Sequence, residues 1–108
     1  MIKAVHIEDE PRNIELLESL IKTHCAEIIS LVGNARNIKD AIALIKEIKP
    51  QLVYLDIELK NGNAFELLAS LPGFSFQIIF VTAFNDYAVK AFQAMYPYNL
   101  FLGRAVEL

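Results

Sequence analysis

The chain carries the stretch LVYLDIELKNGN at residues 52–63. Its first four residues, 52–55, are all apolar, whereas a strand with one wet face would alternate apolar and polar side chains. A short continuous apolar run is typical of a strand buried on both faces, as in a parallel sheet between helices. The run ends at Asp56, and Asn61 with Gly62 then predicts a turn. We therefore expect Asp56 to lie where a buried strand leaves its sheet.

Further apolar runs alternate with helical patterns along the chain. Strands are expected at residues 2–7, 28–32, 52–55, 78–81 and 100–102, with Gly33 closing the second. Helices are expected to begin at Pro11 and after the capping residues Asn37, Asn63 and Asn85, and Pro50 is expected to stop the second helix. The order predicts an α/β domain with a doubly wound, five-stranded parallel sheet between two layers of helices.

Length, composition and charge narrow the class of protein. The 108 residues, 55% of them hydrophobic, are enough for one core and few for two. No apolar run approaches the roughly 20 residues that cross a bilayer, and the single Cys25 has no partner for an internal disulfide. The net charge of −3 argues against direct binding of nucleic acid. We expect a cytoplasmic, globular domain that binds no membrane.

Carboxylates follow the expected strands at one edge of the sheet. Glu8 and Asp9 come after the first strand, Asp56 after the third and Thr82 after the fourth. Ligands of open α/β sheets bind at this edge. Converging carboxylates repel one another unless a cation lies between them, and Mg²⁺ prefers such oxygen ligands. A carboxylate beside Mg²⁺ can attack a phosphoryl group. Alone, the acidic run could be a solvated surface cluster, but its match with Asp56 and Thr82 favours a site.

Four short motifs together resemble a known family. They are Glu8-Asp9-Glu10-Pro11, Leu55-Asp56-Ile57-Glu58, Asn61-Gly62 and Val81-Thr82-Ala83-Phe84. In this order they resemble the receiver domains of response regulators, which have the flavodoxin-like (CheY-like) fold. The amino-acid sequence of residues 4–13, 55–63 and 78–92 is especially similar to that of receivers that precede LytTR-type DNA-binding domains. The resemblance covers roughly residues 1–93.

The resemblance implies a signalling domain and not an enzyme in the usual sense. Asp56 would accept the phosphoryl group from a sensor histidine kinase, and Thr82 would be the switch hydroxyl. The Mg²⁺ ligands would be Glu8, Asp9, Asp56 and the backbone carbonyl of Glu58. The phosphorylated domain would relay the signal to an effector in transcription regulation, with a homodimer through the face of the fourth helix and fifth strand.

The end of the chain departs from the family. Receivers carry a lysine on the fifth strand, and ungapped counting places Leu102 there. A shift of two residues would instead place Arg104 there as a substitute cation, with Phe101 as the aromatic switch residue. We favour the Leu102 register, which predicts weak switching and leaves Arg104 an ordinary surface cation. The fifth helix is expected to be missing, so that residues 1–108 form a truncated or divergent receiver without its effector domain.

Two other functions stay open on the sequence. A degenerate receiver would keep the fold and signal by protein binding alone, which the lost lysine favours. A Mg²⁺-dependent nucleic-acid enzyme of the Toprim kind would use a glutamate after one strand and a D-x-D pair after another. Glu8 with Asp56 and Glu58 mimics that pattern weakly, and the lack of a basic surface argues against it.

Overall fold

A parallel sheet forms the centre of the protein in a computed structural model, which describes residues 1–59 and 61–81. Its strands are β1 (Ile2–Ile7), β2 (Ile29–Ala35), β3 (Leu52–Leu55) and β6 (Gln77–Phe80), in the order β2-β1-β3-β6. The helices are α1 (Pro11–His24), α2 (Ile38–Ile48) and α3 (Ala64–Ala69), and a short antiparallel hairpin joins β4 (Glu58–Leu59) to β5 (Gly62–Asn63). All three strand pairs of the larger sheet are parallel. The doubly wound architecture predicted from the sequence is confirmed.

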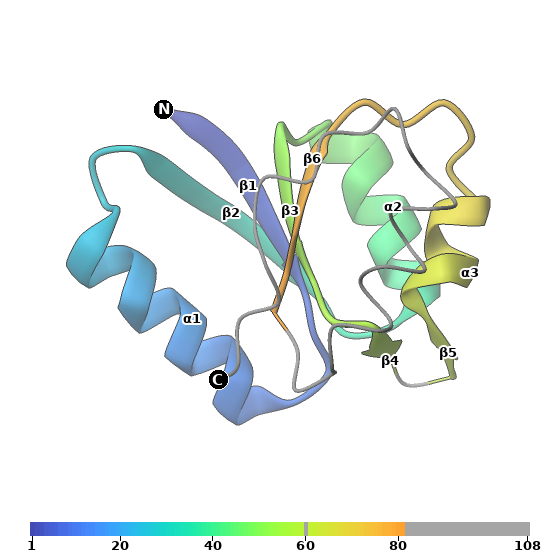
Figure 1. The fold of residues 1–108 in the computed structure, drawn as a ribbon, viewed down its shortest axis with the longest axis horizontal. Helices are drawn as coiled ribbons and strands as arrows, with labels where there is room; N and C mark the ends of the chain where they lie inside the picture. Colours follow the sequence, from blue (N-terminus) through green and yellow to red (C-terminus); the bar gives the residue numbers. More distant parts are fainter. Residues whose placement is uncertain (60, 82–108) are drawn as a thin grey trace.

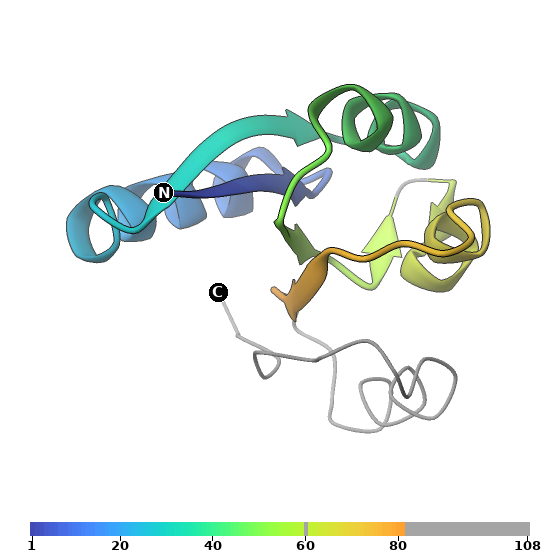
Figure 2. The same ribbon diagram turned by 90° about the horizontal axis from the view of Figure 1, so that it is seen from above.

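The helices cover the two faces of this sheet (Figures 1 and 2). On one face, Leu17 and Ile21 of α1 pack in a cluster with Ala4, Leu52 and Tyr54. On the other face, α2 and α3 contribute the larger cluster, whose buried members include Ala41, Ile45, Ala64, Leu67 and Leu68. All four residues of β3 are buried, as the continuous apolar run predicts.

Each helix begins at the residue that the sequence indicates. The side chain of Asn37 accepts a hydrogen bond from the backbone N–H of Asp40 at 2.8 Å. Asn63 does the same for α3, accepting from the backbone N–H of Glu66 at 3.0 Å. These bonds satisfy N–H groups that lack partners inside the helix. Helix α2 ends before Lys49, whose left-handed backbone (φ 51°) turns the chain into Pro50.

The second strand is longer than predicted. It starts at Ile29 and continues through Gly33 to Ala35, because pairing with β1 extends along the whole strand. A register shift between Ala4 and Val5 accommodates one extra residue. Gly33 serves close packing here, since a Cβ on it would lie 2.9 Å from Cδ1 of Leu44. The prediction that Gly33 ends the strand is wrong.

The predicted turn after β3 is present, whereas the predictions for the C-terminal part lie outside the described residues. The expected turn at Asn61 and Gly62 belongs to the β4–β5 hairpin, where Asn61 takes a positive φ of 68°. The expected helix after Asn85, the strand at 100–102 and the missing fifth helix lie outside the described residues. Within residues 1–59 and 61–81, no helix is both long and apolar enough to cross a membrane.

Candidate metal centre

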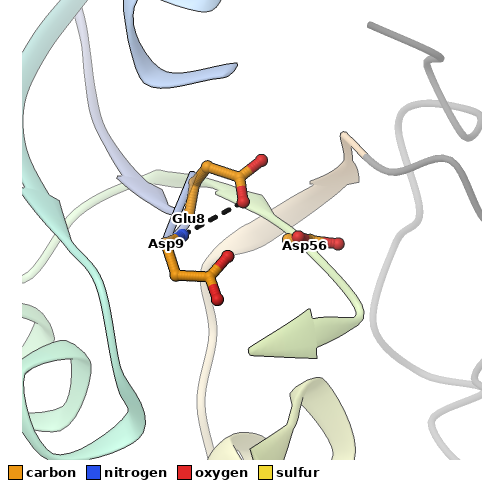
Figure 3. A group of neighbouring side chains, drawn as sticks. All are labelled: Glu8, Asp9 and Asp56. Carbon is orange, nitrogen blue, oxygen red and sulfur yellow. Dashed lines mark hydrogen bonds between the residues drawn. The ribbon is translucent and has the colours of Figure 1, made fainter. Parts of the chain in front are cut away.

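Three carboxylates meet where strands β1 and β3 end. Glu8, Asp9 and Asp56 each place one carboxylate oxygen within 4.8 Å of those of the other two (Figure 3). Two backbone hydrogen bonds fix this geometry beyond the strand ends. The N–H of Glu8 donates to the carbonyl of Ala35 at 2.9 Å, and that of Asp56 donates to the carbonyl of Ile7 at 3.1 Å. The convergence expected at the carboxyl edge of the sheet is therefore present.

Glu8 is the buried member of this cluster, with 1% of its surface exposed. Its Oε2 atom accepts hydrogen bonds from the backbone N–H groups of Asp9 at 3.0 Å and Glu10 at 3.4 Å. Its Oε1 atom is also buried and has no hydrogen-bond partner among the described residues. A buried carboxylate oxygen without a partner is costly. The Glu8 carboxyl group as a whole lies beside the carboxylates of Asp9 and Asp56, where a bound cation would offset their shared negative charge (Figure 3).

The raised pKa of Glu8 reflects its burial and the negative charge of the cluster. Burial, and after it the neighbouring Asp56 carboxyl group, together raise the pKa of this carboxyl from 4.5 to about 7. The Asn13 side chain and the Glu10 backbone N–H oppose the shift, but they are smaller causes. Without a cation, Glu8 is thus only partly ionised at neutral pH. A divalent ion would favour its charged form and lower that pKa.

The donor set fits a hard divalent cation. All three side chains offer oxygen, which Mg²⁺ prefers, and none offers the nitrogen or sulfur that zinc sites use. Asp9 and Asp56 are half-buried, so that one side of the cluster is accessible from solvent. A few carboxylates with open positions leave room for the waters and phosphate oxygens that Mg²⁺ keeps as ligands.

Arg36 is a residue of this edge that the sequence reasoning missed. Its Nη2 atom donates a hydrogen bond to the backbone carbonyl of Asp9 at 3.0 Å. Arg36 directly follows β2. The rule that ligands bind at the carboxyl ends of parallel strands could therefore have identified it. It was missed because β2 was expected to end at Gly33. The contact links the end of β2 to the loop that carries two of the carboxylates.

The remaining predicted site residues either have no tested role in the cluster or lie outside the described residues. Glu58 begins β4, two residues after Asp56, and its side chain is exposed. The role of its backbone carbonyl as a metal ligand stays a prediction. Thr82 and Arg104 lie outside the described residues, as do the alternative residues Phe101 and Leu102.

Comparison with known proteins identifies the family. The family model described as "Response regulator receiver domain" matches residues 4–100. An uncharacterized response regulatory protein of Shewanella oneidensis is 42% identical over 94 residues, which are 85% of this chain and 39% of that protein. The transcriptional regulatory protein BtsR of Salmonella typhi is 34% identical over 94 residues, 86% of this chain and 38% of that protein. The chain thus spans less than two fifths of the length of these relatives.

Solved structures show the same fold. A DNA-binding response regulator of the LuxR family from Staphylococcus aureus superposes with a TM-score of 0.78 at 24% identity, covering 98% of this chain and 86% of that one. The response regulator domain of Thermotoga maritima CheB gives a TM-score of 0.78 at 20% identity, covering 98% and 78%. These likenesses confirm the flavodoxin-like fold, and the family match favours a signalling domain over the Toprim alternative. The chain belongs to the response regulator receiver domain family.

Proposed function

We propose that this receiver domain is phosphorylated on Asp56 in a Mg²⁺-dependent reaction. The observation that carries the proposal is the cluster of Glu8, Asp9 and Asp56, in which a buried Glu8 oxygen has no hydrogen-bond partner in the described part of the chain. Receiver domains generally use Mg²⁺ in their acidic pocket. A degenerate receiver that acts by binding alone would have no need to keep three repelling carboxylates within 4.8 Å of one another.

The proposed reaction is a phosphoryl transfer to a carboxylate. A carboxylate oxygen of Asp56 attacks the phosphorus of a phosphohistidine on a sensor histidine kinase. A P–O bond forms, the P–N bond breaks, and its electron pair stays on the histidine, which takes up a proton. Mg²⁺ held by Glu8, Asp9, Asp56 and the carbonyl of Glu58 would supply the positive charge that offsets repulsion between the carboxylate and the phosphoryl group. The hydroxyl of Thr82 would hydrogen-bond a phosphoryl oxygen as the switch residue.

We also propose that the unusual C-terminal sequence weakens the response to phosphorylation. With Leu102 in place of the family lysine, one contact that exists only in the phosphorylated state is lost, and a ligand shifts an equilibrium only through such contacts. Arg104 could restore the charge if the strand is shifted by two residues. Arg104→Ala and Leu102→Lys separate the two registers. Loss of phosphorylation-dependent change in oligomer size in Arg104→Ala, without a gain in Leu102→Lys, would contradict the Leu102 register.

The proposed context is a cytoplasmic two-component system that regulates transcription. The relatives include proteins named as transcriptional regulators, and this chain spans about 38% of their length. We propose that residues 1–108 act as the receiver domain and signal to an effector of the LytTR type, which the resemblance in residues 4–13 and 55–63 supports. A homodimer through the fourth helix and fifth strand is part of the same proposal.

Calorimetric titration with Mg²⁺ in the absence of phosphate tests the metal centre. Asp9→Asn removes one ligand charge from an accessible position, and we expect it to weaken Mg²⁺ binding at least about tenfold. Glu47→Gln is the matched control, because Glu47 is an exposed carboxylate on α2, away from the cluster. Equal affinity in the wild type and Asp9→Asn would contradict the assignment of the metal ligands.

A further inference from the structure

A concave surface lies at the opposite edge of the sheet from the carboxylates. It has a volume of about 640 Å³ and is lined by Ile45, Lys46, Lys49, Pro50 and residues 70–76. We call it the basic groove. Pro50 lies just before β3 and Phe76 just before β6, so the groove adjoins the edge where these parallel strands begin. Figure 1 shows the end of α2 and the loop after α3 together at this edge. None of its residues belongs to the candidate metal centre.

The floor of the basic groove is apolar and aromatic. The rings of Phe74 and Phe76 stack with their centroids 4.8 Å apart and an interplanar angle of 26°. Ile45 and Leu71 are buried beside them and belong to the same core cluster as Phe76. Packing in the hydrophobic core therefore fixes the side chains of this floor in place. Its volume lies within the range of about 300–1,000 Å³ that is usual for ligand pockets.

The rim of the groove carries uncompensated positive charge. Lys46 and Lys49 line it, and no carboxylate among the described residues does, although the chain as a whole has a net charge of −3. Neither lysine side chain makes an ion pair or hydrogen bond with another described residue. Their positions at the end of α2 suit the helix dipole, which favours cations near a helix C-terminus. The helix dipole accounts for the two lysines, but it does not account for the concave aromatic surface next to them.

We propose that the basic groove binds an acidic peptide segment of a partner protein. An apolar side chain of the segment would pack on the Phe74–Phe76 pair, and its flanking carboxylates would approach Lys46 and Lys49. This combination of apolar anchor and charge complementarity is what gives such docking sites their affinity and specificity. Nucleic acid fits the groove poorly, because it requires a broad basic surface and the groove offers two cations over an apolar floor. The partner segment binds independently of phosphorylation at Asp56.

The test uses the whole 108-residue chain and a synthetic peptide with capped ends, in which one phenylalanine is flanked on both sides by glutamates. Binding is followed by NMR chemical shifts and by calorimetry. The double variant Lys46→Gln, Lys49→Asn removes both charges, and asparagine tolerates the left-handed backbone at position 49. We expect this variant to bind about tenfold more weakly, since the charge contacts of two exposed lysines are lost.

Two controls separate the groove from general charge attraction. Lys39→Gln neutralises a lysine on the first turn of the same helix, outside the groove, and we expect it to bind the peptide as the wild type does. A peptide with glycine in place of phenylalanine should lose most of its affinity. The proposal is overturned if Lys39→Gln weakens binding as much as the double variant, if the glycine peptide binds equally well, or if the wild type binds neither peptide. Shift changes centred away from residues 45–50 and 70–76 would also overturn it.

Discussion

Replacing Glu8 by glutamine should stabilise the metal-free protein, and the gain should grow with pH. Glu8 is 1% exposed, and burial followed by the Asp56 carboxylate raises its pKa from 4.5 to about 7. A carboxyl whose folded pKa is raised contributes stability below its unfolded pKa and loses it as pH rises through the folded pKa. Because the unfolded chain releases this proton at a lower pH than the fold does, the titration of Glu8 lowers the stability by about 1 kcal/mol at pH 5 and about 3 kcal/mol at pH 8. Glutamine has nearly the same shape and no charge, so Glu8→Gln avoids this cost.

Urea denaturation at pH 5 and pH 8, with a chelator present, measures the effect. We expect the free energy of unfolding of Glu8→Gln to exceed that of the wild type by about 2 kcal/mol more at pH 8 than at pH 5. Saturating Mg²⁺ should reverse the order at pH 8, because the ion stabilises the wild type through Glu8 and the variant lacks that ligand charge. A difference between the two proteins that does not change with pH would refute the reasoning. So would equal stabilisation of both proteins by Mg²⁺.

Three further predictions concern a buried histidine, a closely packed glycine and a helix cap. Burial lowers the pKa of His6 to about 4, so the neutral side chain contributes stability above pH 6.5 that is lost as pH falls toward 4. His6→Leu should flatten the pH dependence of the free energy of unfolding in this range, measured by urea denaturation, and an unchanged dependence would contradict this expectation. Gly62→Ala should destabilise the fold by about 1–3 kcal/mol, because the added Cβ meets the Ile38 side chain, and Ile38→Ala should relieve part of that loss. Asn37→Ala removes the cap of α2 and should lower the free energy of unfolding by about 0.5–2 kcal/mol, which is seen as a lower melting temperature. An unchanged melting temperature would show that the cap contributes nothing.

The sequence predicted the central strands and the helix starts because these depend on local chemistry. The four residues of β3 form a continuous apolar run, and Asn37 and Asn63 have side chains suited to capping. The convergence of Glu8 with Asp56 followed from a general rule for parallel sheets, in which the strand ends share one edge. Each of these predictions needed only the order of the elements and the type of residue at their ends.

The features that were missed depend on tertiary contacts. Gly33 is usually a sign of a turn, but pairing with β1 continues the strand beyond it. Strands β4 and β5 have two residues each, which is too short for any periodicity to show. The acidic run at residues 8–10 has the composition of a solvated loop, so burial of Glu8 could not be foreseen. The contact of Arg36 with the Asp9 carbonyl was hidden because the end of β2 was misplaced.

The central claim is that Asp56 accepts a phosphoryl group with the help of Mg²⁺. The most direct test is the intact mass of the protein after incubation with a small phosphodonor, for the wild type with Mg²⁺, the wild type with a chelator, and Asp56→Asn with Mg²⁺. The amide of asparagine has the shape of the carboxylate but is not a nucleophile. We predict a base-labile mass gain of one phosphoryl group in the first sample and none in the other two. No gain in the first sample, or the same gain in Asp56→Asn, would contradict the account.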